Sequence, residues 1–230
     1  MTIEGLQKLT LLDYPGRTAC TVFLAGCNFR CPFCHNFELV AKPAAPLMTD
    51  EELLGFLQKR KGLLDGVAIT GGEPLMRREL PELLRKIKAL GYAVKLDTNG
   101  SFPARMKALV EEGLVDYVAM DVKNAPDRYG ETVGFLKLEL DAIRESVEYL
   151  KSGVVDYEFR TTVIEQYHSE SEIRAIAQWI QGAKRWFLQQ FKSSERVPNG
   201  ELTAPSFQKM QEYLQIAQQI IPETELRGVG

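Results

Sequence analysis

The chain has 230 residues, 45% of them hydrophobic and 26% charged, which is enough for one domain with a substantial core. The 28 Lys and Arg residues stand against 31 Asp and Glu, and a net charge of −3 gives no electrostatic reason to expect nucleic-acid binding. No run approaches the roughly 18 consecutive apolar residues that span a bilayer, and residues 1–16 lack the basic and apolar segments of a secretory signal. We therefore expect a single domain over residues 1–230, without a membrane partner.

The first predicted elements surround a group of cysteines. An apolar, β-prone run over Ala19–Leu24 predicts a strand, and the loop behind it contains Cys27, Cys31 and Cys34. The fourth cysteine, Cys20, lies within the predicted strand, where a buried free thiol is expected. The sequence contains no cysteine after position 34. Reduced thiols in such a chain indicate the cytoplasm.

A capping box at residues 49–52 begins the first predicted helix, and strands and helices then alternate. The further candidate strands are short and apolar, as in a buried parallel sheet: Val67–Thr70, Tyr92–Leu96, Val115–Met120, Tyr157–Val163 and Arg185–Gln189. The further candidate helices are Glu79–Leu90, Pro103–Glu112, Leu138–Lys151, Ser169–Ile180 and Ala204–Ile220. Six strand–helix units predict an α/β fold, either barrel-like or doubly wound. Six units are two short of a closed eight-stranded barrel, and the pattern alone leaves the two arrangements open.

The cysteine loop over residues 27–34 places three thiols within eight residues. An iron–sulfur cubane bound by three thiolates would keep one iron open to a substrate or cofactor. Three other interpretations remain. A disulfide framework usually spreads its cysteines along a small secreted chain, a zinc site would need His35 beside Cys34, and a fully ligated electron-transfer cluster would need Cys20. The spacing favours the open cluster over these alternatives.

Glycines and polar residues gather where the predicted strands end. Gly71-Gly72-Glu73-Pro74 follows the second strand, Asp97-Thr98-Asn99-Gly100 the third and Asp121-Val122-Lys123 the fourth. The fifth strand carries Arg160, and the sixth ends at residues 189–190. Each motif alone is typical of a turn, a helix cap or a surface ion pair. Ligands of parallel α/β folds bind beyond the carboxyl ends of the strands, so the joint position of these motifs predicts a ligand site.

The cysteine spacing, the following His35-Asn36 and the Gly-Gly-Glu-Pro motif at 71–74 resemble the radical S-adenosylmethionine (SAM) enzymes. A narrower resemblance is to the activases of glycyl-radical enzymes. It is closest to the activating proteins of anaerobic ribonucleoside-triphosphate reductase, the anaerobic ribonucleotide reductase, in the form that is similar to pyruvate formate-lyase activase. Residues 5–16, 97–100 and 226–228 carry this narrower resemblance, which covers essentially the whole chain.

The resemblance implies a fold, two cofactors and a reaction. The implied fold is an incomplete (β/α)6 barrel of the TIM type. The implied cofactors are a [4Fe-4S] cluster, bound by Cys27, Cys31 and Cys34, and SAM, whose amino and carboxylate groups chelate the open iron. Reductive cleavage of SAM yields methionine and a 5′-deoxyadenosyl radical, so the cofactors carry the chemistry and no catalytic side chain is named.

The resemblance also implies which residues contact SAM, all of them at strand ends or in the cysteine loop. The implied contacts are Gly72 and Glu73 with the amino group, beside Gly71; Asp121 and Lys123 with the ribose or the carboxylate, with Arg160 nearby; and Phe33 and His35 with the adenine. Asp97 and Asp121 are expected to bracket a monovalent cation. Phe33 departs from the family, which usually has a tyrosine there, and it keeps the stacking ring without the hydroxyl.

Three functions are compatible with the sequence. The first is an activase that abstracts hydrogen from a glycine of a partner enzyme, the second a radical SAM enzyme for a purine-like or pterin-like small molecule, and the third an iron–sulfur electron carrier. With Cys20 alone outside the triad, the chain lacks thiols for an auxiliary cluster, which favours the activase. The expected partners are a glycyl-radical enzyme, with anaerobic ribonucleotide reductase preferred over pyruvate formate-lyase, and a flavodoxin- or ferredoxin-type electron donor. The sequence contains no recognisable motif for the partner surface.

Overall fold

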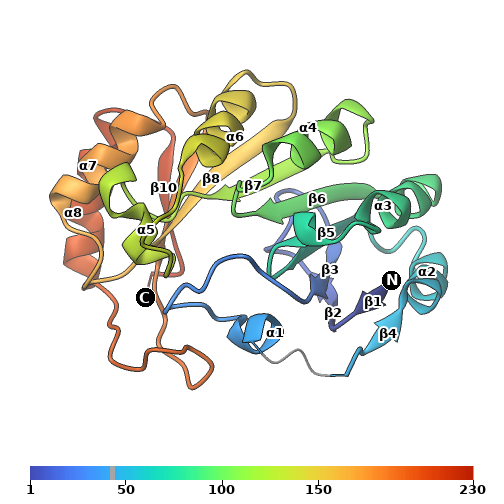
Figure 1. Cartoon of the computed structure of the whole chain (residues 1–230). Helices are drawn as coiled ribbons and strands as arrows, with labels where there is room; N and C mark the ends of the chain where they lie inside the picture. Colours follow the sequence, from blue (N-terminus) through green and yellow to red (C-terminus); the bar gives the residue numbers. More distant parts are fainter. Residues whose placement is uncertain (42–44, 230) are drawn as a thin grey trace.

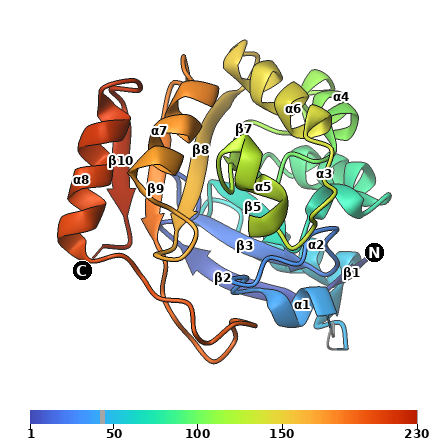
Figure 2. The ribbon, with the colours of Figure 1, turned by 60° about the vertical axis from the view of Figure 1, so that its left-hand side comes forward.

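A curved, mostly parallel β-sheet forms the centre of the molecule in the computed structural model, which describes residues 1–41 and 45–229 (Figures 1 and 2). Its strands are β2 (Gly5–Thr10), β3 (Ala19–Leu24), β5 (Gly66–Gly71), β6 (Ala93–Thr98), β7 (Tyr117–Asp121), β8 (Asp156–Val163), β9 (Trp186–Gln190) and β10 (Thr224–Arg227). Their spatial order is β10-β9-β8-β7-β6-β5-β3-β2, and β2 alone runs antiparallel to its neighbour. Two short strands, β1 (Thr2–Ile3) and β4 (Met48–Thr49), form a separate antiparallel pair.

The long helices lie on the outer side of the curved sheet (Figures 1 and 2). The helices are α1 (Phe37–Ala41), α2 (Asp50–Lys59), α3 (Leu80–Ala89), α4 (Pro103–Glu111), α5 (Tyr129–Thr132), α6 (Asp141–Lys151), α7 (Glu170–Trp179) and α8 (Phe207–Gln218), with 3-10 turns at Pro74–Met76 and Pro126–Arg128. The predicted capping box is formed, because Thr49 accepts from the Glu52 amide and Glu52 accepts from the Thr49 amide at 2.8 Å. The short helices α1 and α5 were not predicted.

Alternation along the central strands sorts side chains between the two faces of the sheet. On β6, Val94 and Leu96 are fully buried and join the core beneath the helices. Lys95 and Asp97 alternate with them and form an ion pair on the concave side. Full burial of each aliphatic side chain contributes about 1.5–3 kcal/mol, so the convex face stabilises the fold while the concave face remains free for polar groups.

The prediction of an α/β fold is confirmed, all six predicted strands are present and β10 adds a seventh parallel strand, and the sheet resembles an incomplete barrel. The strand order from β3 to β10 follows the chain without reversal, whereas a doubly wound sheet reverses at a switch point. In the described part of the chain the edges β2 and β10 are not paired with each other, so the barrel stays open. The sequence analysis missed both edge strands, because β2 is half-exposed and polar and β10 has only four residues.

One hydrophobic cluster extends from Ile3 in β1 to Ile221 behind α8. Cys20 is fully buried in this cluster, as predicted, and burial raises the pKa of its thiol to about 12. The thiol therefore stays protonated and behaves as a small apolar side chain. Among the residues that the structure describes, no helix is both long and apolar enough to cross a membrane.

Candidate active site

A cavity of about 230 Å³ opens at the carboxyl ends of the parallel strands. It is lined by the three cysteines of the loop and by these predicted site residues: Phe33, His35, Gly71, Gly72, Asp97, Asp121, Lys123 and Arg160. The cavity also exposes residues that the sequence analysis did not single out as ligand contacts: Phe29, Asn36, Val40, Thr70, Thr98, Asn99, Thr162 and Gln189. Among the predicted site residues Glu73 alone is outside this lining.

The cysteine loop turns its three thiols toward this cavity. The Cys34 amide donates to the Cys31 carbonyl at 3.1 Å and closes a tight turn, and the Phe29 amide lies 3.4 Å from the Cys27 sulfur. Burial raises the pKa of all three thiols, that of Cys31 to about 12. Buried thiolates therefore need a nearby cation, and iron bound to the sulfurs would provide it. The donor set suits a cluster bound by three cysteines.

The zinc alternative depends on His35. The His35 ring packs against Phe191 with ring centroids 5.6 Å apart, and burial, together with the charge of Lys123, lowers its pKa. Within the described residues no group of three Cys, His, Asp or Glu side chains gathers closely enough to hold a single metal ion. A cubane is bound differently, because each thiolate binds a different iron.

The paired glycines bring the end of β5 against the cysteine loop. A β-carbon on Gly71, whose φ is +121°, would lie 2.2 Å from the Leu24 carbonyl oxygen. One on Gly72 would lie 2.0 Å from the Gly26 carbonyl oxygen and 3.3 Å from the Cys27 β-carbon. Only glycine permits this approach, so the pair sets the position of the loop as well as lining the cavity.

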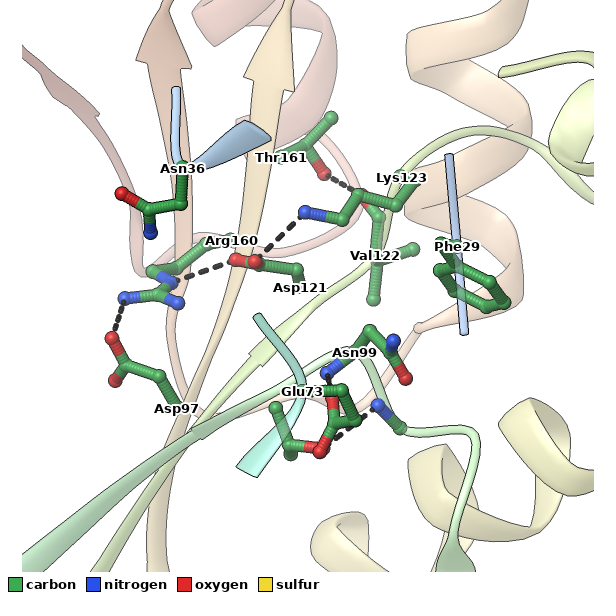
Figure 3. A network of polar contacts seen from close by, with 12 residues as sticks. Phe29, Asn36, Glu73, Asp97, Asn99, Asp121, Val122, Lys123, Arg160 and Thr161 are labelled. Atoms are coloured by element: carbon green, nitrogen blue, oxygen red, sulfur yellow. Dashed lines mark hydrogen bonds and ion pairs between the residues drawn. The ribbon is translucent and has the colours of Figure 1, made fainter. Parts of the chain in front are cut away.

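Glu73 is fully buried outside the cavity lining, and its carboxylate accepts hydrogen bonds from residues of the strand-end motifs (Figure 3). Its carboxylate accepts from the Leu75 amide at 3.0 Å, the Thr98 hydroxyl at 2.9 Å and the Asn99 amide at 2.7 Å. Burial raises its pKa to about 7, although these three donors favour the ionised form. Asn99, which the sequence analysis noted only as part of a strand-end motif, reaches the Asn28 side chain at 3.0 Å and lies 3.8 Å from the Cys27 sulfur.

Four charged side chains form a continuous ladder along the concave face (Figure 3). The Lys123 ammonium contacts Asp121 at 2.8 Å, and Arg160 joins Asp121 at 2.9 Å to Asp97 at 3.2 Å. Burial alone would raise the pKa of Asp121, but Arg160 and Lys123 lower it to about 2. Burial alone would lower the pKa of Lys123, but the negative charge of Asp121 outweighs burial and raises the pKa of Lys123. All four groups are therefore charged at neutral pH.

The Arg160 guanidinium lies between Asp97 and Asp121, where the sequence analysis expected a monovalent cation. Arg160 supplies a positive charge to both carboxylates, and the pKa of Asp97 is lowered chiefly by Arg160 and Lys95 against the effect of burial. The additional cation stays a prediction.

Side chains from three other segments hold the backbone behind β7. The Asp121 carbonyl accepts from the Tyr129 hydroxyl at 3.3 Å, and the Val122 carbonyl accepts from Thr161 at 2.7 Å. The Lys123 carbonyl lies 3.0 Å from Nε2 of His168. Because Nδ1 of His168 accepts from the Ile164 amide at 3.1 Å, the ring proton is on Nε2 and is donated to Lys123. No sequence signal pointed to His168, which lies 45 residues from its partner.

The family of the chain follows from comparison with known proteins. The model of the radical SAM superfamily matches residues 21–180, which include the cysteine loop, the glycine pair and the charge ladder. The chain belongs to the radical SAM superfamily. It is an enzyme that uses a [4Fe-4S] cluster together with SAM, and the resemblance noted in the sequence is confirmed.

Relatives of known sequence and structure are found within and beyond the activating enzymes. A protein of Methanocaldococcus jannaschii provisionally named as a glycyl-radical enzyme activating enzyme, MJ1227, is 30% identical over 99% of this chain and 96% of its own length. The pyruvate formate-lyase-activating enzyme of Clostridium pasteurianum is 30% identical over 79% of this chain and 77% of its own length. Among solved structures, SuiB of Streptococcus suis superimposes with a TM-score of 0.70 at 15% identity and covers 90% of this chain. The chain spans about half of SuiB (48%), and this likeness concerns the fold alone.

Proposed function

We propose that this chain is the activase of a glycyl-radical enzyme. The observation that carries the proposal is the full-length match to MJ1227, which leaves no large part of either chain unmatched. The cysteine inventory agrees with it. Cys20 is fully buried and outside the cavity lining, so the chain has three thiols for iron and none for a second cluster that could hold a small substrate.

In this proposal Cys27, Cys31 and Cys34 bind the cluster, and SAM lies against the strand ends. When bound, the two cofactors supply a 5′-deoxyadenosyl radical by one-electron cleavage of a carbon–sulfur bond. The protein's task is to orient SAM and to keep water from the radical. The buried Phe29 and Phe33, both 3% exposed, serve the second purpose.

The contacts to SAM follow from the charges and the backbone approach of the cavity. The Lys123 ammonium suits the SAM carboxylate, the Asp121 carboxylate suits the ribose hydroxyls, and Arg160 keeps Asp121 ionised. Gly71 and Gly72 let a ligand approach the backbone closely. Phe33 and His35 offer ring faces to the adenine. Glu73 acts from behind the wall, through Asn99, and does not reach the amino group directly.

A second hollow of about 430 Å³ adjoins the cavity and shares His35, Thr162 and Gln189 with it. We propose that a glycine-bearing loop of the partner enters here, because the open barrel leaves this side accessible. The preferred partner is anaerobic ribonucleotide reductase in the cytoplasm, with reduction by a flavodoxin- or ferredoxin-type donor. A pyruvate formate-lyase-type enzyme is the alternative partner.

The test is to mix the anaerobically reconstituted, reduced protein with SAM and the anaerobic ribonucleotide reductase of the same organism. A doublet electron paramagnetic resonance signal is expected, and it should change when the α-carbon of the partner's glycine is deuterated. Success only with a formate-lyase-type partner would change the partner and keep the reaction. Turnover of a small molecule without any protein radical would overturn the activase.

A further inference from the structure

A hollow of about 410 Å³ lies on the outer surface between α3 and α4, away from the mouth of the SAM cavity. Figure 1 shows these two helices beside each other on the outer side of the sheet. The charged residues around the hollow are four arginines and one glutamate: Arg77, Arg78, Arg85, Arg105 and Glu112. Its apolar lining consists of Leu75, Leu80, Pro81, Ala108 and Leu109. An apolar floor with a polar rim that contains arginine is typical of a protein–protein interface.

Arg78 and Arg105 carry the positive charge that remains available to a partner. Arg105 donates to the carbonyl oxygens of Leu75 at 2.5 Å and Met76 at 3.2 Å, and these neutral acceptors leave its charge in place. Arg78 is exposed. Two rim arginines have a carboxylate partner, because Arg85 makes a two-point contact with Glu112 at 2.5 and 2.8 Å and Arg77 lies 3.9 Å from a Glu4 carboxylate oxygen.

The positive surface is unusual within an acidic chain. The lining of the hollow holds four arginines and one glutamate, and Glu4 pairs with Arg77, which leaves a surplus of two positive charges, whereas the whole chain carries −3. A local surplus of this size attracts an acidic protein surface and accelerates its association.

The floor of the hollow is connected to the cluster side of the protein by very few residues. Leu75 lies three residues behind Gly72, and three residues span at most about 11 Å. Gly72 lines the cavity, and a β-carbon on it would lie only 3.3 Å from the Cys27 β-carbon. The Leu75 amide also donates to Glu73, which holds Asn99 beside the Cys27 sulfur. A protein docked on this hollow therefore lies behind the wall that carries a cluster ligand.

We infer that this α3–α4 hollow, which we name the arginine hollow, is the docking surface of the acidic protein that delivers the electron to the cluster. The inference rests on the reductive chemistry of the superfamily and deepens the proposed function. One electron leaves the carrier and enters the cluster, and no bond forms between the two proteins. The carrier occupies the back wall, and the mouth beside His35 and Gln189 stays open to the glycine-bearing partner, so both proteins can bind at once.

The experiment measures reduction of the cluster-loaded protein by hydroquinone flavodoxin, an acidic one-electron carrier, followed by the loss of cluster absorbance at low ionic strength. Arg78→Glu should slow this reduction about tenfold at subsaturating flavodoxin, and added salt should slow the unmodified protein in the same way. Glu112→Gln, which leaves Arg85 without its carboxylate, should speed it. Reduction by dithionite, which needs no docking, should be unchanged in both variants.

The matched control is Arg174→Glu, which makes the same charge change on the exposed side of α7. Equal rates for Arg78→Glu and the unmodified protein, or equal losses in Arg78→Glu and Arg174→Glu, would overturn the inference. Loss of binding to the glycine-bearing partner with normal flavodoxin reduction would assign the hollow to that partner instead. The readout is cluster reduction, so it remains informative even if no glycine radical forms.

Discussion

At the scale of single residues, Lys123 is held at both ends. Its ammonium contacts Asp121 at 2.8 Å, and its carbonyl accepts from His168 at 3.0 Å. The His168 ring is only 2% exposed, and both of its nitrogens are used, so it acts as a fixed neutral support for the loop. The position of the Lys123 ammonium, which we propose faces the SAM carboxylate, thus depends on a residue outside the cavity.

Replacing His168 tests this support. His168→Leu removes the donor to the Lys123 carbonyl and should lower the free energy of unfolding by about 1–3 kcal/mol, because a buried carbonyl is left unpaired. It should also weaken SAM binding, because Lys123 loses the support that fixes its position. His168→Gln keeps a side-chain amide donor and should retain most of the affinity. Equilibrium binding of SAM to the cluster-loaded variants measures the effect. Equal affinities for the Leu variant and the unmodified protein would show that His168 does not position Lys123.

The same residue makes stability depend on pH. Burial lowers the pKa of His168 from 6.5 to about 4, so its contribution to the free energy of unfolding is complete above about pH 6.5 and is lost as the pH falls to about 4. The loss amounts to about 3 kcal/mol. The pH dependence from Glu73 runs in the opposite direction. Its pKa is raised from 4.5 to about 7, so the stability that it contributes is present below about pH 4.5 and is lost as the pH rises to about 7. The unmodified protein and the His168→Gln variant both retain Glu73, so a difference between their pH profiles reports on His168.

Urea unfolding at pH 7.5, 6 and 5 should therefore show that the unmodified protein loses more stability on acidification than His168→Gln does. Parallel pH profiles for the two proteins would contradict the assignment of a buried neutral ring.

The three loop cysteines make a sharper prediction. Replacing Cys27, Cys31 or Cys34 with serine should abolish the iron–sulfur absorbance after anaerobic reconstitution, because each change removes one thiol from a site without a spare. Cys20→Ser, in the core of β3, should keep the cluster and lose only some stability. The ligand assignment is wrong if Cys20→Ser removes the cluster while one of the other variants retains it.

At the scale of elements, the contact between β5 and the cysteine loop depends on a missing side chain. The Gly72 amide donates to the Leu24 carbonyl and the Glu73 amide to the Gly26 carbonyl, at 2.8 and 2.7 Å. These bonds join the ends of β3 and β5 across the site of the glycine pair. The sequence analysis predicted Gly72 as a SAM contact. The structure shows in addition that Gly72 holds the cysteine loop in place.

Gly72→Ala should therefore reduce cluster loading as well as SAM binding, because its β-carbon would lie 2.0 Å from the Gly26 carbonyl oxygen. Gly55→Ala in α2 is the matched control, since a β-carbon there meets nothing within 4 Å. The control should load normally and gain about 0.5–1 kcal/mol in helix stability. Iron content after reconstitution, with thermal unfolding of both variants, measures the difference. Full loading of Gly72→Ala would show that the loop can move without losing the site.

At the scale of the whole molecule, charged side chains on the concave face of the sheet form ion pairs between strands. Arg160 on β8 joins Asp121 on β7 to Asp97 on β6, so one guanidinium links three adjacent strands. Arg227 on β10 similarly donates two hydrogen bonds, of 2.7 and 2.8 Å, to the buried Glu158 carboxylate on β8. This contact connects the edge strand to the rest of the sheet. Such pairs bring little net stability, but the loss of one partner is costly because the other remains buried and charged.

Arg160→Met should consequently lower the free energy of unfolding by about 3 kcal/mol. The pKa of Asp121, about 2 beside Arg160, should rise in the variant. In the unmodified protein, the stability that ionised Asp121 contributes is present above about pH 3.8 and is lost as the pH falls through about 2. The higher pKa reduces this contribution in the variant, which should therefore lose less stability on acidification than the unmodified protein. Arg144→Met, at an exposed position on α6, should change stability by less than about 0.5 kcal/mol. Denaturant unfolding at pH 7 and at about pH 2 gives both comparisons, and equal stabilities for the two variants at pH 7 would contradict the role of Arg160 in the charge ladder.

Much of this protein can be predicted from the sequence because its signals are local. Strand periodicity, helix caps and cysteine spacing depend on neighbours within a few residues, and they correctly predicted six strands and the long helices. Every predicted site residue except Glu73 lines the cavity, but eight further lining residues were not singled out. The short edge strands β2 and β10 were not predicted, because edge strands gain their stability from pairing with the rest of the sheet.

Tertiary structure alone decided how those signals combine. The carboxyl ends of distant strands meet only after the sheet forms, and this places Glu73 behind Asn99, Arg160 between two carboxylates and His168 beneath Lys123. The sheet stays open because its edges are not paired in the described residues, and strand count by itself could not show that. Contacts over 39 to 45 residues, such as those of Arg160 and His168, carry no local signature, because only packing selects them.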